Sequence, residues 1–364
     1  MTLEGGLRIA DCELRTADFP ADVDVAIVAH NNLSALPATL RSLADTGCPA
    51  ERITVVDVAS TDGTADWMAR EWPRARVRRL DRNEGPSPGR NVGITEASRR
   101  FVFLMDADVR VEPGAVQRLH AAMLSDAAIK VGSPIVVHAD HPDRIQYAGG
   151  ALHFICEAVN PWLDRPLAER GSSPMDIGAA PTCALLLDRA AAIDVGLFDE
   201  RYFIGKEDGD FTHRIKMAGY KIWELPHALV LHNSRPRGAW LFYYQIRNRW
   251  HFILKNYQLS TIVCLIPPLL VHEPLQFIVL VVKGHGWTYL RAVAGLIAML
   301  PALARDRAIA RRIRRRPDRD LLVAAPFVVR DDLAANVAIR SGKVLYERLL
   351  SGYWRLLTKT VLAR

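Results

Sequence analysis

The sequence predicts an α/β fold, and three observations support this prediction. Short apolar runs rich in β-branched residues alternate with helical segments between residues 23 and 137, polar residues follow several of these runs, and a long apolar region comes late in the chain. Alternation of this kind is typical of a parallel sheet with helices packed on it. A chain of 364 residues can form one large α/β domain with an appendage, or two domains.

The expected elements follow one another in regular order. Strands are predicted at 23–30, 52–60, 75–83, 101–106 and 131–137, with helices between them at 33–47, 63–73, 87–100 and 112–125. This part of the chain should form a doubly wound sheet. Residues 138–235 are less regular, but an apolar run at 182–187, a helix starting near Lys206 and a strand-like run at 221–232 should extend the sheet and cover a pocket.

Polar residues lie at the ends of the predicted strands. In doubly wound sheets, ligands bind beyond the carboxyl ends of the strands. The residues expected there are His30, Asn31, Asp57, Asp62, Asn83, Asp106 and Asp108.

Composition and charge exclude several classes of protein. The five cysteines are scattered, without the spacing of a zinc site or a disulfide framework, which favours a reducing cytosol. The N-terminus shows no secretory signal pattern. The net charge is +7, but residues 305–319 hold eight arginines and two aspartates, so the basicity is concentrated in one patch that could face anionic lipid or nucleic acid.

The pair Asp106 and Asp108 ends the buried strand 101–106. Three further Asp-x-Asp pairs occur, at 22/24, 208/210 and 318/320, so the spacing alone is weak evidence. Carboxylates at a strand end can bind Mg²⁺ or Mn²⁺ together with a substrate phosphate. They can equally cap the following turn, and the motif by itself does not separate the two interpretations.

Other motifs also have two interpretations. Asp57 and Asp62 can accept hydrogen bonds from a ribose or base, but Asp62 can simply hold a turn. The glycine-rich loop 83–93 permits close approach to a phosphate, although it also suits a plain turn.

Acidic residues gather at the predicted helix near Lys206. Glu207, Asp208 and Asp210 can stabilise the helix dipole, with Asp210 and Arg214 as an i,i+4 pair. One of them can instead act as a general base. His232, at the end of another apolar run, is more often structural than a ligand, but its position leaves metal ligation open.

Together, seven segments resemble the inverting GT-A glycosyltransferases of family 2, and more closely their bacterial rhamnosyltransferase-like branch. In chain order they are VAIVAHNN, VVDVASTDGT, NEGPSPGRNVG, FLMDADV, VGLFDERYFIGKEDGDFTHRIKMAGYKI, LVLHNS and YYQIRNRWHFILKNY. The resemblance covers residues 23–257. It implies an N-terminal segment (1–22), a GT-A Rossmann-like nucleotide-sugar-binding domain (23–257) and a C-terminal helical, membrane-associating region (258–364).

The resemblance also implies roles for individual residues. It places Asp208 as the catalytic base, Asp108 and His232 at a divalent metal (Mn²⁺ or Mg²⁺), and Glu207 and Arg247 on the acceptor or leaving-group side. The residues expected to bind the donor nucleotide sugar are His30, Asn32, Asp57, Asp62, Asn83, Gly85, Arg90 and Asp106. Two alternatives remain open, namely a nucleotide-sugar-binding protein without turnover and a nucleotidyltransferase.

Departures from the family pattern bear on the substrates. The first strand ends in His30-Asn31-Asn32 where relatives usually have a Thr or Ser, Tyr, Asn series, so the donor can carry dTDP, UDP or GDP, with dTDP-rhamnose the first expectation. Gln245 and Arg249 lie one residue too far apart for the QxxRW motif of processive synthases. This favours addition of one or a few sugars to a glycan or polyprenyl-linked acceptor.

The tail is expected to associate with a membrane. Residues 259–282 and 287–304 are long and apolar, but the first run has His272 and Glu273 near its middle. An in-plane or re-entrant helix pair is favoured over a spanning hairpin, with the buried core of a second domain as a further alternative. The arginine patch would then bind anionic lipid on the inner face of the cell membrane, and a nucleic-acid role is disfavoured because no recognised nucleic-acid fold accompanies the patch.

Overall fold

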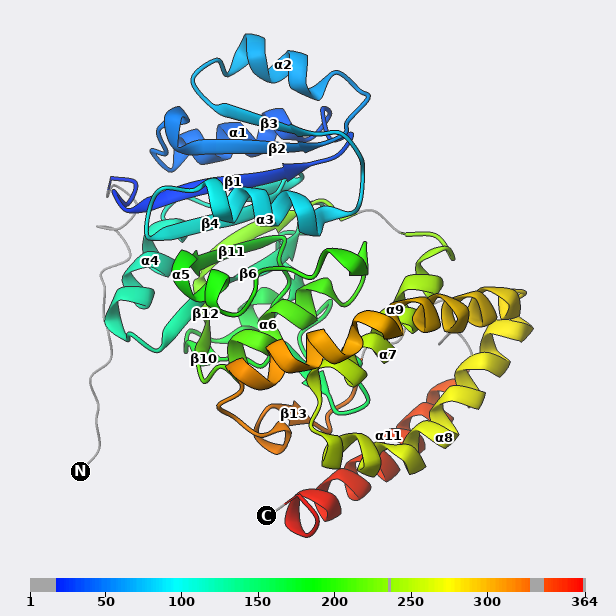
Figure 1. Cartoon of the computed structure of the whole chain (residues 1–364). Coiled ribbons are helices and arrows are strands. Elements are labelled where there is room, and N and C mark those ends of the chain that lie inside the picture. The colour runs from blue at the N-terminus through cyan, green and yellow to red at the C-terminus, as the bar shows by residue number, and fades with distance from the viewer. Residues whose placement is uncertain (1–17, 235–236, 328–336, 363–364) are drawn as a thin grey trace, which may run out of the picture.

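The computed structural model describes residues 18–234, 237–327 and 337–362, and a mixed β-sheet forms the centre of the fold (Figure 1). The strands β1 (Val23–Ala29), β2 (Ile53–Val58), β3 (Arg76–Leu80) and β4 (Phe101–Asp106) pair in parallel, in the order β3-β2-β1-β4. Beyond β4 the sheet continues with β11 (Ala184–Asp188), β6 (Ile129–His138), β12 (Lys221–His232) and β10 (Met175–Asp176). The short strands β5 (Val109–Val111) and β7 (Ile145–Tyr147) pair with β12 and β6. The expected segment 1–22 lies mostly outside the described residues.

The expectation of a doubly wound parallel sheet needs one correction. Strand β11 lies between β4 and β6 and runs antiparallel to both. The run at 131–137 therefore belongs to the sheet but does not neighbour β4. Every residue of β11 is buried, so its apolar pattern favours a central place in the sheet but carries no information on direction.

Helices cover both faces of the sheet. On one face α1 (Leu36–Asp45) and α4 (Ala115–Ser125) pack with the inward side chains of β1, and α2 (Thr64–Glu71) contributes Met68 to the same core. On the other face lie α3 (Pro86–Glu96), α5 (Arg189–Asp194) and α6 (Glu207–Met217). Alternate residues of β1 enter the two cores, as the pleat of a strand requires. The short helices η1 (Ala50–Arg52), η2 (Leu167–Arg170), η3 (Glu200–Tyr202) and η4 (Asp318–Asp320) lie in the connections.

Long helices form the C-terminal part of the molecule, at the lower right of Figure 1. They are α7 (Leu241–Asn256), α8 (Leu259–Val282), α9 (Gly286–Ile313) and α11 (Val337–Lys359). Helix α7 packs along α9, while α7, α8 and α11 share a core with a small sheet made of β13 (Leu322–Val323), β8 (Ala151–His153) and β9 (Ala158–Val159).

Two of these helices, α8 and α9, are long and apolar enough to cross a membrane. Only 28% of the most apolar window of α8 and 6% of that of α9 is buried. The alternative that these runs form the buried core of a second domain was therefore wrong.

The arginine patch at 305–319 is only partly free to meet a partner. Arg307, Arg314 and Arg319 donate hydrogen bonds to the backbone carbonyls of Leu254, Asn256 and Leu362. The exposed arginines of the patch are Arg305, Arg311, Arg312 and Arg315. Part of the charge therefore fastens the end of α9 to the body of the protein.

Candidate active site

A cavity of about 850 Å³ opens at the carboxyl ends of the central strands. Its lining brings together most of the residues that the sequence indicated, from β1, β4, β12 and the first turns of α3 and α6. These lining residues are His30, Asn32, Asn83, Gly85, Arg90, Asp106, Asp108, Glu207, Asp208 and His232. Side chains separated by about 200 positions in the sequence thus surround one space.

Asp106, Asp108 and His232 form the group that can hold a metal ion. One ligand atom from each lies within 4.8 Å of the others. Asp106 ends β4, and the antiparallel pairing of β5 with β12 sets His232 opposite Val109, next to Asp108. The His232 Nε2 atom lies 3.6 Å from Asp108 Oδ1.

The chemistry of this group fits a divalent cation. The Nδ1 atom of His232 lies 2.7 Å from the side-chain oxygen of Gln146, so Nδ1 donates and the Nε2 lone pair faces two carboxylates. Burial raises the pKa of Asp106, and Asp108 adds to this effect, while Arg90 opposes it. Burial opposes protonation of His232, but Asp108 and Asp106 outweigh it and raise its pKa. A bound Mn²⁺ or Mg²⁺ would relieve the repulsion between the Asp106 and Asp108 carboxylates.

Arg90 joins the candidate metal group to the acidic start of α6. Its side chain is only 4% exposed, and its guanidinium lies 2.9 Å from Asp208 Oδ1, 3.2 Å from Asp106 Oδ1 and 3.7 Å from Glu207 Oε1. The arginine therefore holds carboxylates from β4 and α6 at fixed positions in one cavity, rather than projecting freely towards a ligand.

Asp208 and Glu207 differ in environment although they are neighbours. The Asp208 side chain is 35% exposed and accepts a hydrogen bond from the hydroxyl of Thr182, whereas that of Glu207 is 7% exposed. The Glu207 Oε2 atom is buried and has no hydrogen-bond partner among the described residues. Burial, and then the charge of Asp208, raise the pKa of Glu207 well above its ordinary value. The accessible carboxylate of the pair is thus Asp208.

Polar groups at the ends of β1 and β2 form another part of the cavity wall. The Nδ1 atom of His30 lies 2.6 Å from the carbonyl oxygen of Val58, and the backbone N–H of His30 donates to Asn32 Oδ1 at 3.0 Å. The side-chain oxygen of Asn83 accepts from the backbone N–H of Gly85 at 2.9 Å. These contacts order both loops before any ligand arrives.

Three residues to which the family resemblance assigns a role do not line the cavity. Asp57 is fully buried and accepts from the backbone N–H of Ser60, with Arg79 at 3.4 Å. Asp62 accepts from the backbone of Leu33 and from Thr64, so it holds a turn, as its alternative interpretation had it. Arg247 donates to the carbonyl oxygens of Arg201 and Tyr202, which belong to the loop before α6.

Sequence patterns assigned no role to several further residues at the site. Gln146 lines the cavity and orients His232, Phe203 and Trp240 add aromatic surface to its wall, and Thr182 donates to Asp208. Phe203 lies within one of the seven segments that carry the resemblance, but the segment assigned it no function. The polar contacts join residues 26 and 86 positions apart, so no local pattern could have revealed them.

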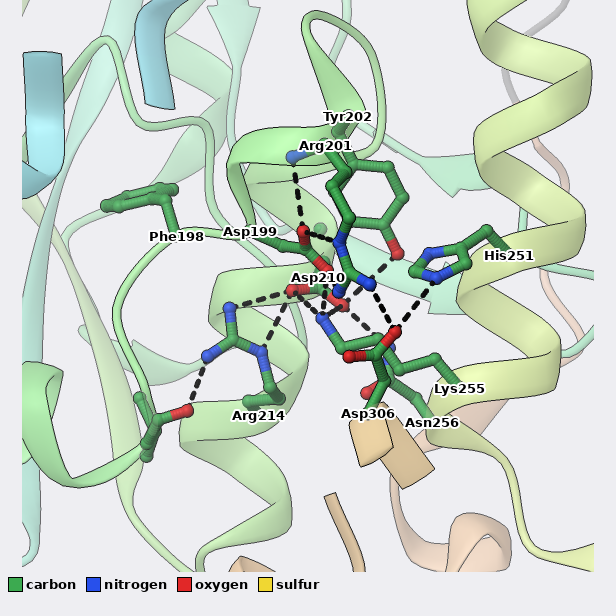
Figure 2. A network of polar contacts seen from close by, with 12 residues as sticks. Phe198, Asp199, Arg201, Tyr202, Asp210, Arg214, His251, Lys255, Asn256 and Asp306 are labelled. Carbon is green, nitrogen blue, oxygen red and sulfur yellow. Dashed lines mark hydrogen bonds and ion pairs between the residues drawn. The ribbon is translucent and has the colours of Figure 1, made fainter. Parts of the chain in front are cut away.

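A buried polar network fixes α6 behind the cavity, as Figure 2 shows. Asp210 pairs with Arg214 at 2.7 Å, which confirms the predicted i,i+4 pair, and it also accepts from Lys255 and Asn256 of α7. Arg201 pairs with Asp199, and through Asp306 it reaches α9. The helix that carries Asp208 is thereby tied to α7 and α9.

The geometry can be compared with known proteins. Residues 24–191 match the family model described as glycosyl transferase family 2. The match covers somewhat less than half of the chain. The matched segment supplies Asp106 and Asp108, whereas Asp208 and His232 follow it in the chain.

Two curated proteins are similar to parts of this chain. Succinoglycan biosynthesis protein ExoO of Rhizobium meliloti (strain 1021) is 34% identical over 143 residues, which cover 39% of this chain and 39% of that protein. N-acetylglucosaminyl-diphospho-decaprenol L-rhamnosyltransferase of Mycobacterium tuberculosis is 28% identical over 235 residues, which cover 58% of this chain and 76% of that protein. The match thus spans well under half of the first relative.

Solved structures agree with the fold of the glycosyltransferase domain. GalNAc-T7, determined with UDP, GalNAc and Mn²⁺, superposes with a TM-score of 0.53 at 19% identity, over 65% of this chain and 48% of that one. S. aureus TarS gives a TM-score of 0.50 at 17% identity, over 91% of this chain and 55% of that one. The sheet and the helices around it therefore have the GT-A architecture.

Proposed function

We propose that this protein is a metal-dependent inverting glycosyltransferase. It transfers a sugar from a nucleoside-diphosphate sugar to a hydroxyl group of a glycan or lipid-linked acceptor at the inner face of the cell membrane. The observation that carries the proposal is the arrangement in one cavity of an accessible carboxylate, Asp208, and a metal-binding group, Asp106, Asp108 and His232, with Arg90 between them.

The donor is held between the polar loops and the metal group. His30, Asn32, Asn83 and Gly85 line the side that would receive the nucleotide, while Asp108 and His232, supported by Asp106, would hold Mn²⁺ or Mg²⁺. When bound, the ion offsets the negative charge that grows on the leaving nucleoside diphosphate. Arg90 keeps Asp106 oriented towards the same place.

Asp208 acts as the general base. Its carboxylate takes the proton from the acceptor hydroxyl as the oxygen attacks the anomeric carbon and the bond to the nucleoside diphosphate breaks. Thr182 and Arg90 orient the carboxylate, and Glu207, held in its neutral form, adds no further charge beside it. A single in-line displacement inverts the configuration of the anomeric carbon.

Known proteins guide the choice of substrates. The M. tuberculosis relative is named for transfer of L-rhamnose to a diphospho-decaprenol acceptor, and GalNAc-T7 was determined with a UDP nucleotide and Mn²⁺. We take dTDP-rhamnose as the first donor to test, followed by UDP- and GDP-sugars. A sugar-diphospho-polyprenol is the preferred acceptor class, consistent with synthesis of a cell-envelope glycan.

The C-terminal helices support docking on a membrane in the plane of its surface. Exposed aliphatic side chains run along the length of α8, and we call Leu259, Val263, Ile266, Leu270, Ile278 and Val282 the aliphatic stripe. Near the middle of the helix, the Glu273 side chain is only 15% exposed, because it pairs with Arg249 of α7 and accepts from Tyr289. A spanning orientation would carry this ion pair and α7 into hydrocarbon, which is costly, whereas an in-plane orientation immerses only the stripe.

The decisive test is a screen of nucleotide sugars with the full chain. Hydrolysis and thermal shift are measured with dTDP-rhamnose and with UDP- and GDP-sugars, each with Mn²⁺, with Mg²⁺ and with chelator. We expect one donor to be hydrolysed slowly and to raise the melting temperature only when the metal is present. Binding without hydrolysis or transfer to any sugar lipid would favour a nucleotide-sugar-binding protein, and no metal-dependent response to any donor would refute the proposal.

A further inference from the structure

The loop before α6 contains a strained residue at the cavity. Phe203 has φ +59° and ψ −67°, and the backbone N–H of Ile204 donates to the carbonyl oxygen of Tyr202 at 2.7 Å, which makes a γ-turn centred on Phe203. This kind of turn is rare, and positive φ is strained for a bulky residue. Such strain persists only where the surroundings enforce it.

The surroundings of Phe203 enforce the turn from α7. The side-chain amide of the fully buried Asn248 donates to the carbonyl oxygens of Tyr202, Ile204 and Gly205. Arg247 donates to the carbonyl oxygens of Arg201 and Tyr202. These two side chains donate to backbone carbonyls of one short loop, and Arg247 also donates to the side-chain oxygen of Asn248, so they are positioning residues for the loop.

The polar network of Figure 2 holds the same loop from the other side. The Tyr202 hydroxyl lies 3.3 Å from Asp210 Oδ1, and Arg201 pairs with Asp199 and with Asp306 of α9. The turn is therefore fixed at its backbone and at the side chains that precede it. The protein maintains a costly conformation rather than merely tolerating a flexible one.

This conformation supports an aromatic shelf, which we define as Phe203, Trp240 and Tyr244. The Phe203 and Tyr244 rings stack with centroids 5.0 Å apart, and Trp240 meets Tyr244 edge-on at 6.0 Å. Phe203 and Trp240 line the cavity that contains Asp208, and Trp240 is 51% exposed although it belongs to this cluster. Tyr244 does not line the cavity but contacts both of the other rings.

The shelf is distinct from the nucleotide side of the cavity. The nucleotide loops follow β1 and β3, whereas the shelf comes from the loop before α6 and the start of α7, as the order of elements in Figure 1 indicates. Ring surface of this kind matches the C–H face of a pyranose, and the same loop leads directly into Asp208. The backbone of Phe203 also abuts Gly85, where any side chain would clash with the Phe203 carbonyl, so donor loop and shelf are in contact.

We infer that the aromatic shelf is the acceptor subsite, on which Phe203 and Trp240 stack the sugar ring whose hydroxyl Asp208 deprotonates. This inference rests on the proposed glycosyl transfer and names the acceptor side of that site. The strained turn holds the ring of Phe203 in place, so stacking sets the height of the acceptor sugar above the carboxylate. The ligand class is a pyranose at the end of a glycan or sugar lipid.

The test uses the full chain with the donor found in the screen. The acceptor probe is N-acetylglucosamine linked through diphosphate to a short, water-soluble citronellyl chain, and glucose, galactose and mannose analogues complete the panel. We expect Trp240→Ala and Phe203→Ala each to raise the acceptor KM by about tenfold, as loss of one stacked ring predicts, with the donor KM unchanged. Trp240→Phe should restore most of the affinity.

Trp287→Ala provides the matched control, because Trp287 is an exposed tryptophan on α9 that does not line the cavity. Unchanged acceptor KM in both shelf variants, or an equal rise in donor KM, would overturn the inference. Calorimetric titration of the probes in the presence of nucleotide separates it from the proposed function. Binding that depends on Trp240 without any turnover would uphold the shelf and refute the transferase, whereas donor hydrolysis with no binding of any probe would refute the shelf alone.

Discussion

At the scale of single residues, adjacent side chains acquire opposite properties from their surroundings. Glu207 is buried beside Asp208, which raises its pKa, while Asp208 faces the cavity and accepts from Thr182 and Arg90. A proton acceptor must be charged and reachable by the acceptor hydroxyl. The proposed mechanism gives this role to Asp208, which is the more exposed of the two, and the two carboxylates can be tested as a pair.

Asp208→Asn should abolish transfer while the donor still binds. The amide is nearly the same size but takes up no proton, so the rate should fall on the order of 10²- to 10⁴-fold. Steady-state transfer and nucleotide affinity are measured side by side. Glu207→Gln is the matched control and should lose far less activity, since this side chain is already held neutral; transfer by Asp208→Asn at the wild-type rate would remove Asp208 as the base.

The lowered pKa of the buried His213 leads us to expect that the protein loses stability in mild acid. Burial, and then the charge of Arg314, lower the pKa of His213 to about 3. Below its ordinary pKa of 6.5 the unfolded chain takes up a proton that the folded protein refuses, so stability falls as the pH drops from 6.5 towards 3. The contribution is about 2 kcal/mol at pH 5.

His213→Phe should therefore reduce the difference in unfolding free energy between pH 7 and pH 5. Phenylalanine keeps the ring contacts with Phe252 and Tyr257 and cannot titrate. Urea unfolding at the two pH values measures the difference, with His227→Phe at an exposed position as the control. An unchanged difference in His213→Phe would contradict the assignment.

At the scale of elements, α3 brings Arg90 to the cavity because the helix lies unusually close to the sheet. A Cβ atom on Gly93 would come within 2.6 Å of the Ala26 Cβ atom of β1, and one on Gly89 would come within 2.9 Å of Val28 and Val58. Small residues at these places let the helix approach until the Arg90 guanidinium lies between β4 and α6. The close packing of α3 on the sheet therefore determines where Arg90 lies in the site.

Gly93→Ala should destabilise the protein by about 1–3 kcal/mol, because the added methyl group overpacks the contact between α3 and β1. Gly352→Ala makes the same change within α11, where a Cβ would have no neighbour within 4 Å among the described residues. That control should gain about 0.5–1 kcal/mol from the better helix propensity of alanine. Thermal unfolding compares the two, and equal effects would show that helix packing at Gly93 is not tight.

At the scale of the whole molecule, an ion pair between two helices helps to position the C-terminal region. The Arg249–Glu273 pair joins α8 to α7, while the aliphatic stripe of α8 is exposed. Exposed arginines occur at 305, 311 and 312 in α9 and at 315 just after it. The C-terminal region therefore has both exposed apolar side chains and positive charge, the combination that suits an anionic bilayer.

The full chain should bind vesicles of phosphatidylcholine and phosphatidylglycerol more strongly than vesicles of phosphatidylcholine alone, and high salt should weaken the binding. Leu270→Glu, in the exposed stripe, should reduce flotation with the vesicles. Leu124→Glu is the control, since Leu124 is an exposed leucine on α4, away from these helices. Equal flotation of both variants, or a protein that remains free of all vesicles, would refute this docking surface.

The sequence by itself determined the elements and the sites near strand ends. Alternation of apolar and polar residues is local, so it located the strands, the helices and the apolar tail, and it drew attention to Asp106, Asp108, Asp208 and His232. The family match and the GT-A architecture agree with that interpretation. Patterns with a period of 2 or 3.6 residues report which side of an element is buried.

The tertiary structure alone decided which residues meet. It set β11 between β4 and β6, and it turned Arg90 inward, where it pairs with Asp106 and Asp208. It also kept Asp57 and Arg247 out of the cavity lining and brought Phe203 and Trp240 into it. The physical reason is that hydrogen bonds, burial and ion pairs depend on distance in space, and here they join residues separated by up to 118 positions. No local pattern encodes such contacts.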